Sequence, residues 1–305
     1  MRQAGFSYVA LACACSAARR LGVYGLLPVW FKPHGHVIAA ISGQNTLRLK
    51  SSGLWRVRMK TIVINNQKGG VGKTTLAVHL AWHLAETGSR VLLIDADAQG
   101  NATDTMKRHR GGVTAAELFR QGRAAVAGGA DGITLAASDS SLTDVDRGDS
   151  AGIQQFRDNL RAGSAAFDVC VIDTPPSLGL RSVAALVSAS HVLSPIYLED
   201  YSVKGVKGLL QTVIGVQKRY GRSDMKFLGL LPSNFNTKSP RQRAHLDQLL
   251  REAGKYVFPG HIVARDGYAE AVADGVPVWK LKKRSAQEAG REIRLVLSRI
   301  VEQMG

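Results

Sequence analysis

Short apolar runs alternate along this chain with longer stretches in which apolar residues recur every three or four positions. The runs are TIVIN (61–65), RVLLID (90–95), FDVCVID (167–173), HVLSPIYL (191–198) and KFLGLLP (226–232). Runs of this length that are apolar throughout are typical of strands buried on both faces of a parallel sheet.

The stretches between the runs have the spacing of amphipathic helices. Behind the first run, one helical face consists of Leu76, Ala77, Leu80, Ala81 and Leu84, and Gly88 marks the end of this helix. Further helices are expected over 181–190, 202–219, 240–253 and 286–303. The last two follow capping boxes that begin at Ser239 and Ser285. Residues 111–149, rich in Gly, Ala and Asp, predict no clear element.

The first helix is preceded by a glycine-rich loop, NNQKGGVGKTT, over residues 65–75. Backbone N–H groups in such a loop cradle phosphates, a lysine reaches the β- and γ-phosphates, and a threonine hydroxyl binds Mg²⁺. We expect Lys73 and Thr74 to take these two parts. The nucleotide-binding residues expected in the loop are Lys68, Gly69, Gly70, Val71, Gly72, Lys73, Thr74 and Thr75. Strand, loop and helix together predict an α/β fold of the P-loop NTPase type, with a mostly parallel, twisted sheet and helices on both faces.

Three aspartates follow the ends of predicted strands. Asp173 ends one strand and could hold Mg²⁺ through water, although DTPPS is also an ordinary turn sequence. Asp95 and Asp97 end another strand, and there one carboxylate could orient the attacking water while the other supports metal or loop. The alternative is that both are exposed loop acids. We expect a metal site formed by Thr74, Asp95 and Asp173.

The chain has 305 residues, 45% of them apolar, which suffices for one large or two small packed domains. With 40 basic and 24 acidic residues its formal charge is +16, so polyanions attract it, but charge alone does not select among nucleic acid and acidic membranes. Three cysteines, Cys13, Cys15 and Cys170, exclude a disulfide framework or a four-cysteine metal site and fit a reducing compartment. No run approaches the ~20 apolar residues of a membrane-spanning helix.

Residues 1–58 differ from the rest because they contain eight basic residues and no acidic one. We divide the chain into this basic N-terminal extension and an ATPase domain over 59–305. The extension could include a short signal-peptide core, or act as a targeting or nucleic-acid-binding arm. The interpretation we favour is that it is poorly ordered or not translated in the cell, because Met59 stands directly before the first strand.

Three segments carry a resemblance to a known family. KGGVGKTT, VLLIDADAQGNAT and VCVIDTPPSLG, in this order, resemble the ParA/MinD group of deviant Walker-A ATPases. LSPIYLEDYSVKGVKGLL and GVPVWKLKK are more specifically similar to plasmid partition ParA proteins of the IncC type. The resemblance covers roughly 59–305. It departs at Ala98, where the family usually has proline.

The resemblance implies roles for the loop and its neighbours. Lys68 matches the lysine that crosses a dimer interface to phosphates held by the other subunit, and Asp97 matches the residue that positions the hydrolytic water. Lys68, Lys73 and Asp97 are therefore the expected catalytic residues. The implied activity is slow, Mg²⁺-dependent ATP hydrolysis by a face-to-face homodimer that forms on ATP. Gln67 is usual in ParA members.

The resemblance also implies partners: non-specific double-stranded DNA and a ParB-type centromere-binding protein that stimulates hydrolysis, in a cytoplasmic, nucleoid-associated setting. Phosphate contacts need cations, and the expected DNA-binding residues are Lys280, Lys282, Lys283, Arg284, Lys204 and Lys207. Weaker candidates are Lys218, Arg219, Arg222, Lys238, Arg241 and Arg243. Each cluster could instead be a solvated basic face. Pro232, Ser233 and Asn234, which follow a strand, are candidates for the adenine pocket.

Other functions remain open at this point. A MinD-like ATPase would dock on lipid through a basic amphipathic last helix, but the mixed charges of 286–303 suit packing against the domain better. The cargo could be something other than DNA. An adaptor that binds ATP without hydrolysing it is disfavoured by Asp97, and an iron–sulfur member by the positions of the cysteines.

Overall fold

The computed structural model describes residues 29–32, 36–39, 59–122, 126, 128, 132–199 and 203–305, with only the backbone of 29–32, 36–39, 203 and 204. The chain divides into two compact units, Met1–Arg56 and Val57–Gly305. In the first, β1 (Val29–Lys32) pairs with β2 (His36–Ala39) as antiparallel strands. The other expectations about 1–58 lie outside the described residues.

The second unit is built on a seven-stranded sheet with the strand order β5-β6-β4-β7-β3-β8-β9. All neighbouring strands are parallel. The strands are β3 (Lys60–Ile64), β4 (Val91–Asp95), β5 (Arg110–Thr114), β6 (Ile133–Ala137), β7 (Val169–Asp173), β8 (His191–Tyr197) and β9 (Lys226–Ser233). The five strands expected from the apolar runs are all present. β5 and β6 were missed: β6 lies within the region 111–149, for which no element was predicted, and β5 begins one residue before it.

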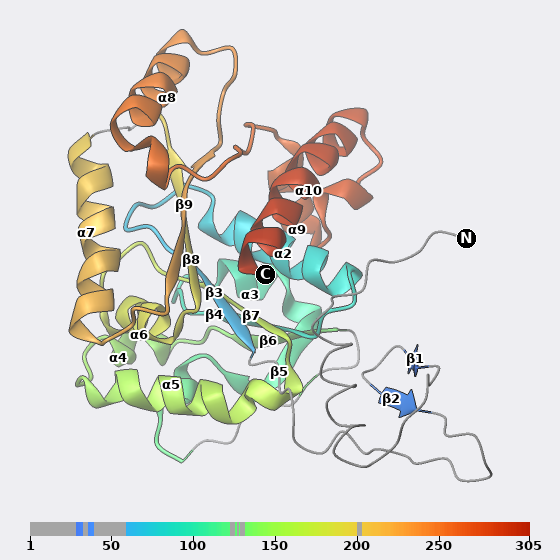
Figure 1. The fold of residues 1–305 in the computed structure, drawn as a ribbon, viewed down its shortest axis with the longest axis vertical. Coiled ribbons are helices and arrows are strands. Elements are labelled where there is room, and N and C mark those ends of the chain that lie inside the picture. The colour runs from blue at the N-terminus through green and yellow to red at the C-terminus, as the bar shows by residue number, and fades with distance from the viewer. Residues whose placement is uncertain are drawn as a thin grey trace, which may run out of the picture. The chain divides into compact units, whose positions relative to one another are not determined.

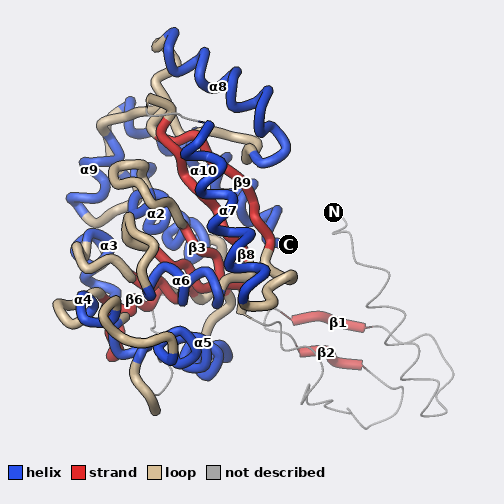
Figure 2. The backbone as a smooth tube through the Cα atoms, turned by 90° about the vertical axis from the view of Figure 1, so that its left-hand side faces the viewer, coloured by secondary structure: helices blue, strands red, loops and turns tan. Residues whose placement is uncertain are grey.

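Helices cover both faces of this sheet (Figures 1 and 2). Successive strand residues alternate between two cores: Ile62 and Ile64 pack with one set of helices and Val63 with the other. The first core includes α2 (Lys73–Glu86), α3 (Asn101–Thr105), α9 (Gly267–Asp274) and α10 (Arg284–Met304). The second includes α4 (Leu142–Val145), α5 (Ala151–Gly163), α6 (Leu180–Ser188) and α7 (Val203–Arg219). The parallel α/β architecture is therefore confirmed.

A third, smaller core joins α7 and α8 (Pro240–Ala253) to the ends of β8 and β9. The cap expected at the start of α8 is confirmed in part. The Ser239 hydroxyl accepts a hydrogen bond from the N–H of Gln242, but the Gln242 side chain accepts from the N–H of Asn236 instead of returning to Ser239.

The second expected capping box is wrong. α10 begins at Arg284, and Lys283 precedes it without any side-chain cap. The residues that were to form the box, 285–288, already lie inside the helix, and Glu288 is within 4 Å of Arg265 and Arg284.

Candidate nucleotide-binding site

The glycine-rich loop connects β3 to α2 at the carboxyl edge of the sheet. Gly70 and Gly72 have φ of +69° and +85°, a region that disfavours side chains. A Cβ on Gly72 would also lie 2.8 Å from the hydroxyl oxygen of Ser233, at the end of β9. Glycine is therefore required at position 72 for two reasons, the positive φ and the close approach of Ser233 at the end of β9.

Lys73 is the first residue of α2 and is buried. Its ammonium donates a hydrogen bond to the carbonyl of Lys68 at 2.7 Å. Burial lowers the pKa of Lys73, while the nearby carboxylates of Asp173 and Asp97 raise it. Because Lys73 begins α2, its charge lies at a helix N-terminus, where anions are favoured.

Asp173, at the end of β7, is the carboxylate next to Thr74. The Thr74 hydroxyl donates to Asp173 Oδ2 at 2.7 Å. Oδ1 is buried and has no hydrogen-bond partner among the described residues. Burial, reinforced by the charge of Asp95, raises the pKa of Asp173 to about 8. A hydroxyl beside an unsatisfied carboxylate oxygen fits Mg²⁺, which binds few protein oxygens and keeps several waters.

Asp95 is also buried, but the chain itself occupies its oxygens. Oδ1 accepts from the N–H of Asp97 at 3.2 Å. Oδ2 accepts from the N–H and the hydroxyl of Thr103 at 2.7 and 2.8 Å. Burial raises the pKa of Asp95 to about 6. These bonds hold the turn that carries Asp97 and favour the alternative in which Asp95 supports the loop.

Asp97 is half-buried, and its Oδ1 accepts from the N–H of Gln99. It lines a cleft of about 710 Å³ together with the loop and Lys73, which is large enough for a nucleotide. The sequence did not indicate several other lining residues: Gln99, Asn101, Asp104, Thr105, Lys107, Pro176, Val272 and Ala273. The last two belong to α9, which only the tertiary fold brings to the loop.

The adenine candidates lie apart from this cleft. Pro232 is buried at the end of β9, and Asn234 is exposed with φ +53°. Neither lines the 710 Å³ cleft. Their part in binding the base stays a prediction, supported only by the proximity of Ser233 to Gly72.

The first residues of the loop are tied to the neighbouring elements. The Asn66 side chain donates to the carbonyl of Pro195 in β8 at 2.7 Å. The Gln67 side chain donates to the hydroxyl of Thr212 in α7 at 3.0 Å. Lys68 follows them and is exposed. The glutamine that replaces the usual glycine thus links the loop to a helix, at the point where an exposed lysine begins the cradle.

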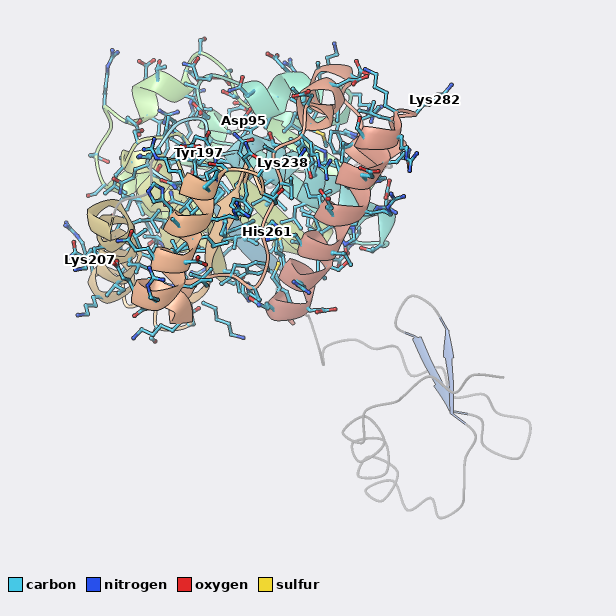
Figure 3. The ribbon with its side chains drawn as sticks, turned by 90° about the horizontal axis from the view of Figure 1, so that it is seen from above. Asp95, Tyr197, Lys207, Lys238, His261 and Lys282 are labelled. Atoms are coloured by element: carbon cyan, nitrogen blue, oxygen red, sulfur yellow. The ribbon has the colours of Figure 1, made fainter. Side chains whose placement is uncertain are left out.

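The expected DNA-binding residues lie in two separate places. Lys282 extends outward from the turn before α10, and Lys207 lies on α7, on the opposite side of the view in Figure 3. The side chain of Lys204 lies outside the described residues. Arg222 is not a surface residue: it is only 4% exposed and bonds to Asp224 and to the carbonyl of Ala189.

The chain matches known proteins over most of its length. Residues 59–227 match the family model described as an AAA domain. Protein IncC of Escherichia coli is 39% identical over 257 residues, which cover 81% of this chain and 70% of that protein. The sporulation initiation inhibitor protein Soj of Bacillus subtilis is 33% identical over 269 residues, 81% of this chain and 99% of that protein.

Solved structures agree with these relatives. The ATP complex of a Cyanothece McdA variant superposes with a TM-score of 0.64 at 25% identity, covering 79% of this chain and 97% of McdA. A plasmid partition protein from Borrelia burgdorferi bound to AMPPNP, at 23% identity and a TM-score of 0.62, shows the same fold over 79% of this chain and 99% of its own. With these matches over the loop, the sheet and the aspartates, the chain belongs to the ParA/MinD family of P-loop ATPases that includes the IncC and Soj partition proteins.

Proposed function

We propose that this partition ATPase forms a homodimer on ATP, binds double-stranded DNA without sequence preference and leaves it after slow, Mg²⁺-dependent hydrolysis that a ParB-type centromere-binding partner stimulates. The observation that carries the proposal is the cleft itself. Lys73, Thr74 and Asp97 line it. The Thr74 hydroxyl donates to Asp173, and a second lysine, Lys68, is exposed at the beginning of the loop.

Within one protomer, Lys73 binds the β- and γ-phosphates, and the loop N–H groups hold the phosphate oxygens. Thr74 would hold Mg²⁺ directly and Asp173 through water. When bound, Mg²⁺ neutralises charge that develops on the transferred phosphoryl group. Asp97 accepts a hydrogen bond from the attacking water and orients it, and the contacts of Asp95 hold the turn on which Asp97 sits.

Dimerisation depends on Lys68. Two triphosphates facing each other across an interface repel, and a cation inserted from each side offsets that repulsion. Lys68 is exposed at the beginning of the loop, while its carbonyl is bonded to Lys73. ATP thereby becomes part of the interface, and hydrolysis dissolves it.

DNA binding runs through residues 280–284, which we call the basic segment. Lys282 and Arg284 are exposed there. Phosphate contacts from such residues give affinity without sequence information. The cations of α7, including Lys207, form the second candidate surface.

A MinD-like membrane function is the alternative, and α10 argues against it. The apolar side of α10, from Ala286 through Ile293 and Leu297 to Met304, is buried in the core of the domain. Leu295 is the large apolar residue of this helix that is exposed. No helix within the described part of the chain is long and apolar enough to cross a membrane. An apolar face already covered by protein is not available to lipid.

The test measures ATP hydrolysis alone, with DNA, and with DNA plus the product of a neighbouring gene, and pairs it with co-sedimentation on DNA and on anionic liposomes. We expect ATP-dependent co-sedimentation with DNA and hydrolysis that rises most when DNA and partner are both present. Co-sedimentation with liposomes and not with DNA would contradict the proposal and favour the MinD-like function.

A further inference from the structure

Two lysines of the basic segment are paired with glutamates from other helices. Lys280 Nζ lies 3.5 Å from Glu86 Oε1, and Lys283 Nζ lies 2.8 Å from Glu270 Oε2. The lysine side chains are 61% and 68% exposed. The pairs are therefore accessible to a competing anion.

Glu86, in the last turn of α2, is held by more than Lys280. The Trp279 indole N–H donates to both of its carboxylate oxygens, at 3.1 and 3.0 Å. Arg294 donates to it at 2.6 Å and stacks its guanidinium 4.6 Å from the Trp279 ring centre. Partial burial raises the pKa of Glu86, but the bond from Trp279 and the charge of Arg294 outweigh it and hold that pKa below its usual range. Glu86 is thus a fixed negative charge beside the basic segment.

The backbone before the basic segment is fixed to the middle of the same helix. The N–H of Val278 donates to His79 Nε2 at 3.2 Å. Gly290 of α10 packs so closely that a Cβ there would lie 2.7 Å from Trp279 Cβ. Val278 and Trp279, which directly precede the basic segment, are therefore anchored to α2 and α10, whereas the side chains of Lys280 and Lys283 beyond them are exposed.

Both glutamates belong to helices that line the nucleotide cleft. α2 starts with Lys73 and Thr74 at the phosphate loop, and α9 contributes Val272 and Ala273 to the cleft wall. Glu270 lies on α9, just before those wall residues. A small displacement of either helix changes the contact between its glutamate and the basic segment.

We propose that Glu86 and Glu270 compete with DNA phosphates for the basic segment, and that α2 and α9, which carry them, make this competition depend on nucleotide. The proposal rests on the proposed function, since it takes residues 280–284 as the DNA surface. Coupling of this kind is reciprocal, so DNA changes ATP affinity by the factor by which ATP changes DNA affinity.

The test replaces each glutamate by glutamine, which keeps the size and a hydrogen-bond acceptor but removes the charge. Exposed ion pairs are weak, so Glu86→Gln and Glu270→Gln should each raise the affinity for a short DNA duplex, measured without nucleotide, about two- to fivefold, and the double variant about tenfold. The ratio of DNA affinities with and without ATP should shrink accordingly. The gain should fade as salt rises because screening weakens the competition.

The matched control is Glu302→Gln. Glu302 is exposed in the last turn of the same helix that Arg284 begins, about 27 Å along its axis, and its replacement alters the net charge equally. Suppose that the parent binds DNA with ATP but the Glu86 and Glu270 variants gain no more DNA affinity than this control. That result would overturn the proposal and leave the proposed function standing. If the variants bind DNA more tightly without nucleotide but ATP does not recruit the parent to DNA, the competition by the two glutamates would be supported and its dependence on nucleotide would be overturned. No binding by any variant would overturn both.

Discussion

At the scale of single residues, two lysines five positions apart in one loop have different surroundings. Lys73 is buried and its ammonium donates to the carbonyl of Lys68, while Lys68 is exposed at the beginning of the loop. We expect Lys73→Ala to abolish ATP binding, because it removes the charge paired with the β- and γ-phosphates. Lys68→Ala should bind ATP but stay monomeric. Calorimetry of ATP binding and light scattering with ATP measure the two effects, and a Lys68→Ala dimer would contradict the sandwich arrangement.

Asp97 gives a second prediction at this scale. Asp97→Ala should still dimerise on ATP, because Lys68, Lys73 and Thr74 are untouched. It should hydrolyse ATP at least about 100-fold more slowly, in the range typical for loss of a group that positions or deprotonates a reactant, and should stay on DNA longer. Single-turnover hydrolysis and dissociation from DNA measure this. Asp95→Asn serves as the comparison. Because the Asp95 carboxylate holds the turn that carries Asp97, its replacement should lower both the hydrolysis rate and the thermal stability.

The sequence alone predicted that Lys73, Thr74 and Asp173 lie close together, while their roles stay predictions. Lys73 and Thr74 lie together because a strand, a tight turn and a helix N-terminus leave few arrangements, and Asp173 lies beside Thr74 because β7 pairs with β3. The contact of Ser233 with Gly72 depends on where β9 lies in the sheet. The bonds from Thr103 to Asp95 depend on the course of the turn between β4 and α3. No pattern in the chain encodes them.

At the scale of elements, α2 connects the phosphate loop with the segment before α10 through His79. The Thr75 carbonyl can only accept, so Nδ1 carries the proton at 2.7 Å and Nε2 accepts from Val278. Burial lowers the pKa of His79 to about 4. Protonation of Nε2 would break the bond to Val278 and place a charge among the rings of Trp82 and Tyr268.

The sign of the pH effect follows from this lowered pKa. In the unfolded chain His79 titrates near 6.5, so between pH 6.5 and 4 the unfolded state binds more protons and stability falls as pH falls. The contribution is on the order of 3 kcal/mol across that window. Urea unfolding at pH 7 and pH 4.5 should show a smaller pH-dependent loss for His79→Gln than for the parent. The exposed His261→Gln is the control, and equal losses in all three proteins would refute this role.

The sequence patterns were less reliable for an edge strand and for the start of a helix. Five strands were predicted from apolar runs, but β5 was missed because its sequence, RGGVT, is glycine-rich and half-exposed at the sheet edge. The start of α10 was placed two residues late because a capping-box pattern occurs at Ser285. The actual helix begins without a side-chain cap, since contacts of the preceding turn with α2 hold it in place.

At the scale of the whole molecule, residues 1–58 contribute +8 to the formal charge of +16, and the ATPase domain contributes the other +8, from 32 basic and 24 acidic residues. The basic residues of the domain lie on surfaces on different sides of it. Lys282 and Lys207 lie on opposite sides of the view in Figure 3. Arg222 is buried and does not contribute to either surface. One protomer therefore cannot present all its expected DNA contacts to a single straight duplex. Net charge draws the protein to a polyanion, while the local clusters decide which face meets it.

A salt titration distinguishes the two faces. Each neutralised phosphate contributes about 0.9 to the slope of log affinity against log salt. The triple variant Lys282→Ala/Lys283→Ala/Arg284→Ala, measured with ATP, should bind all DNA sequences more weakly and flatten the slope by about that amount for every phosphate that it no longer neutralises. ATP binding and dimerisation should not change, because the three residues lie outside the nucleotide cleft. An unchanged slope and affinity would move the DNA surface to α7 and Lys207. Weakening for one sequence alone would mean that bases are being read, which a surface built of exposed cations on a turn is not shaped to do.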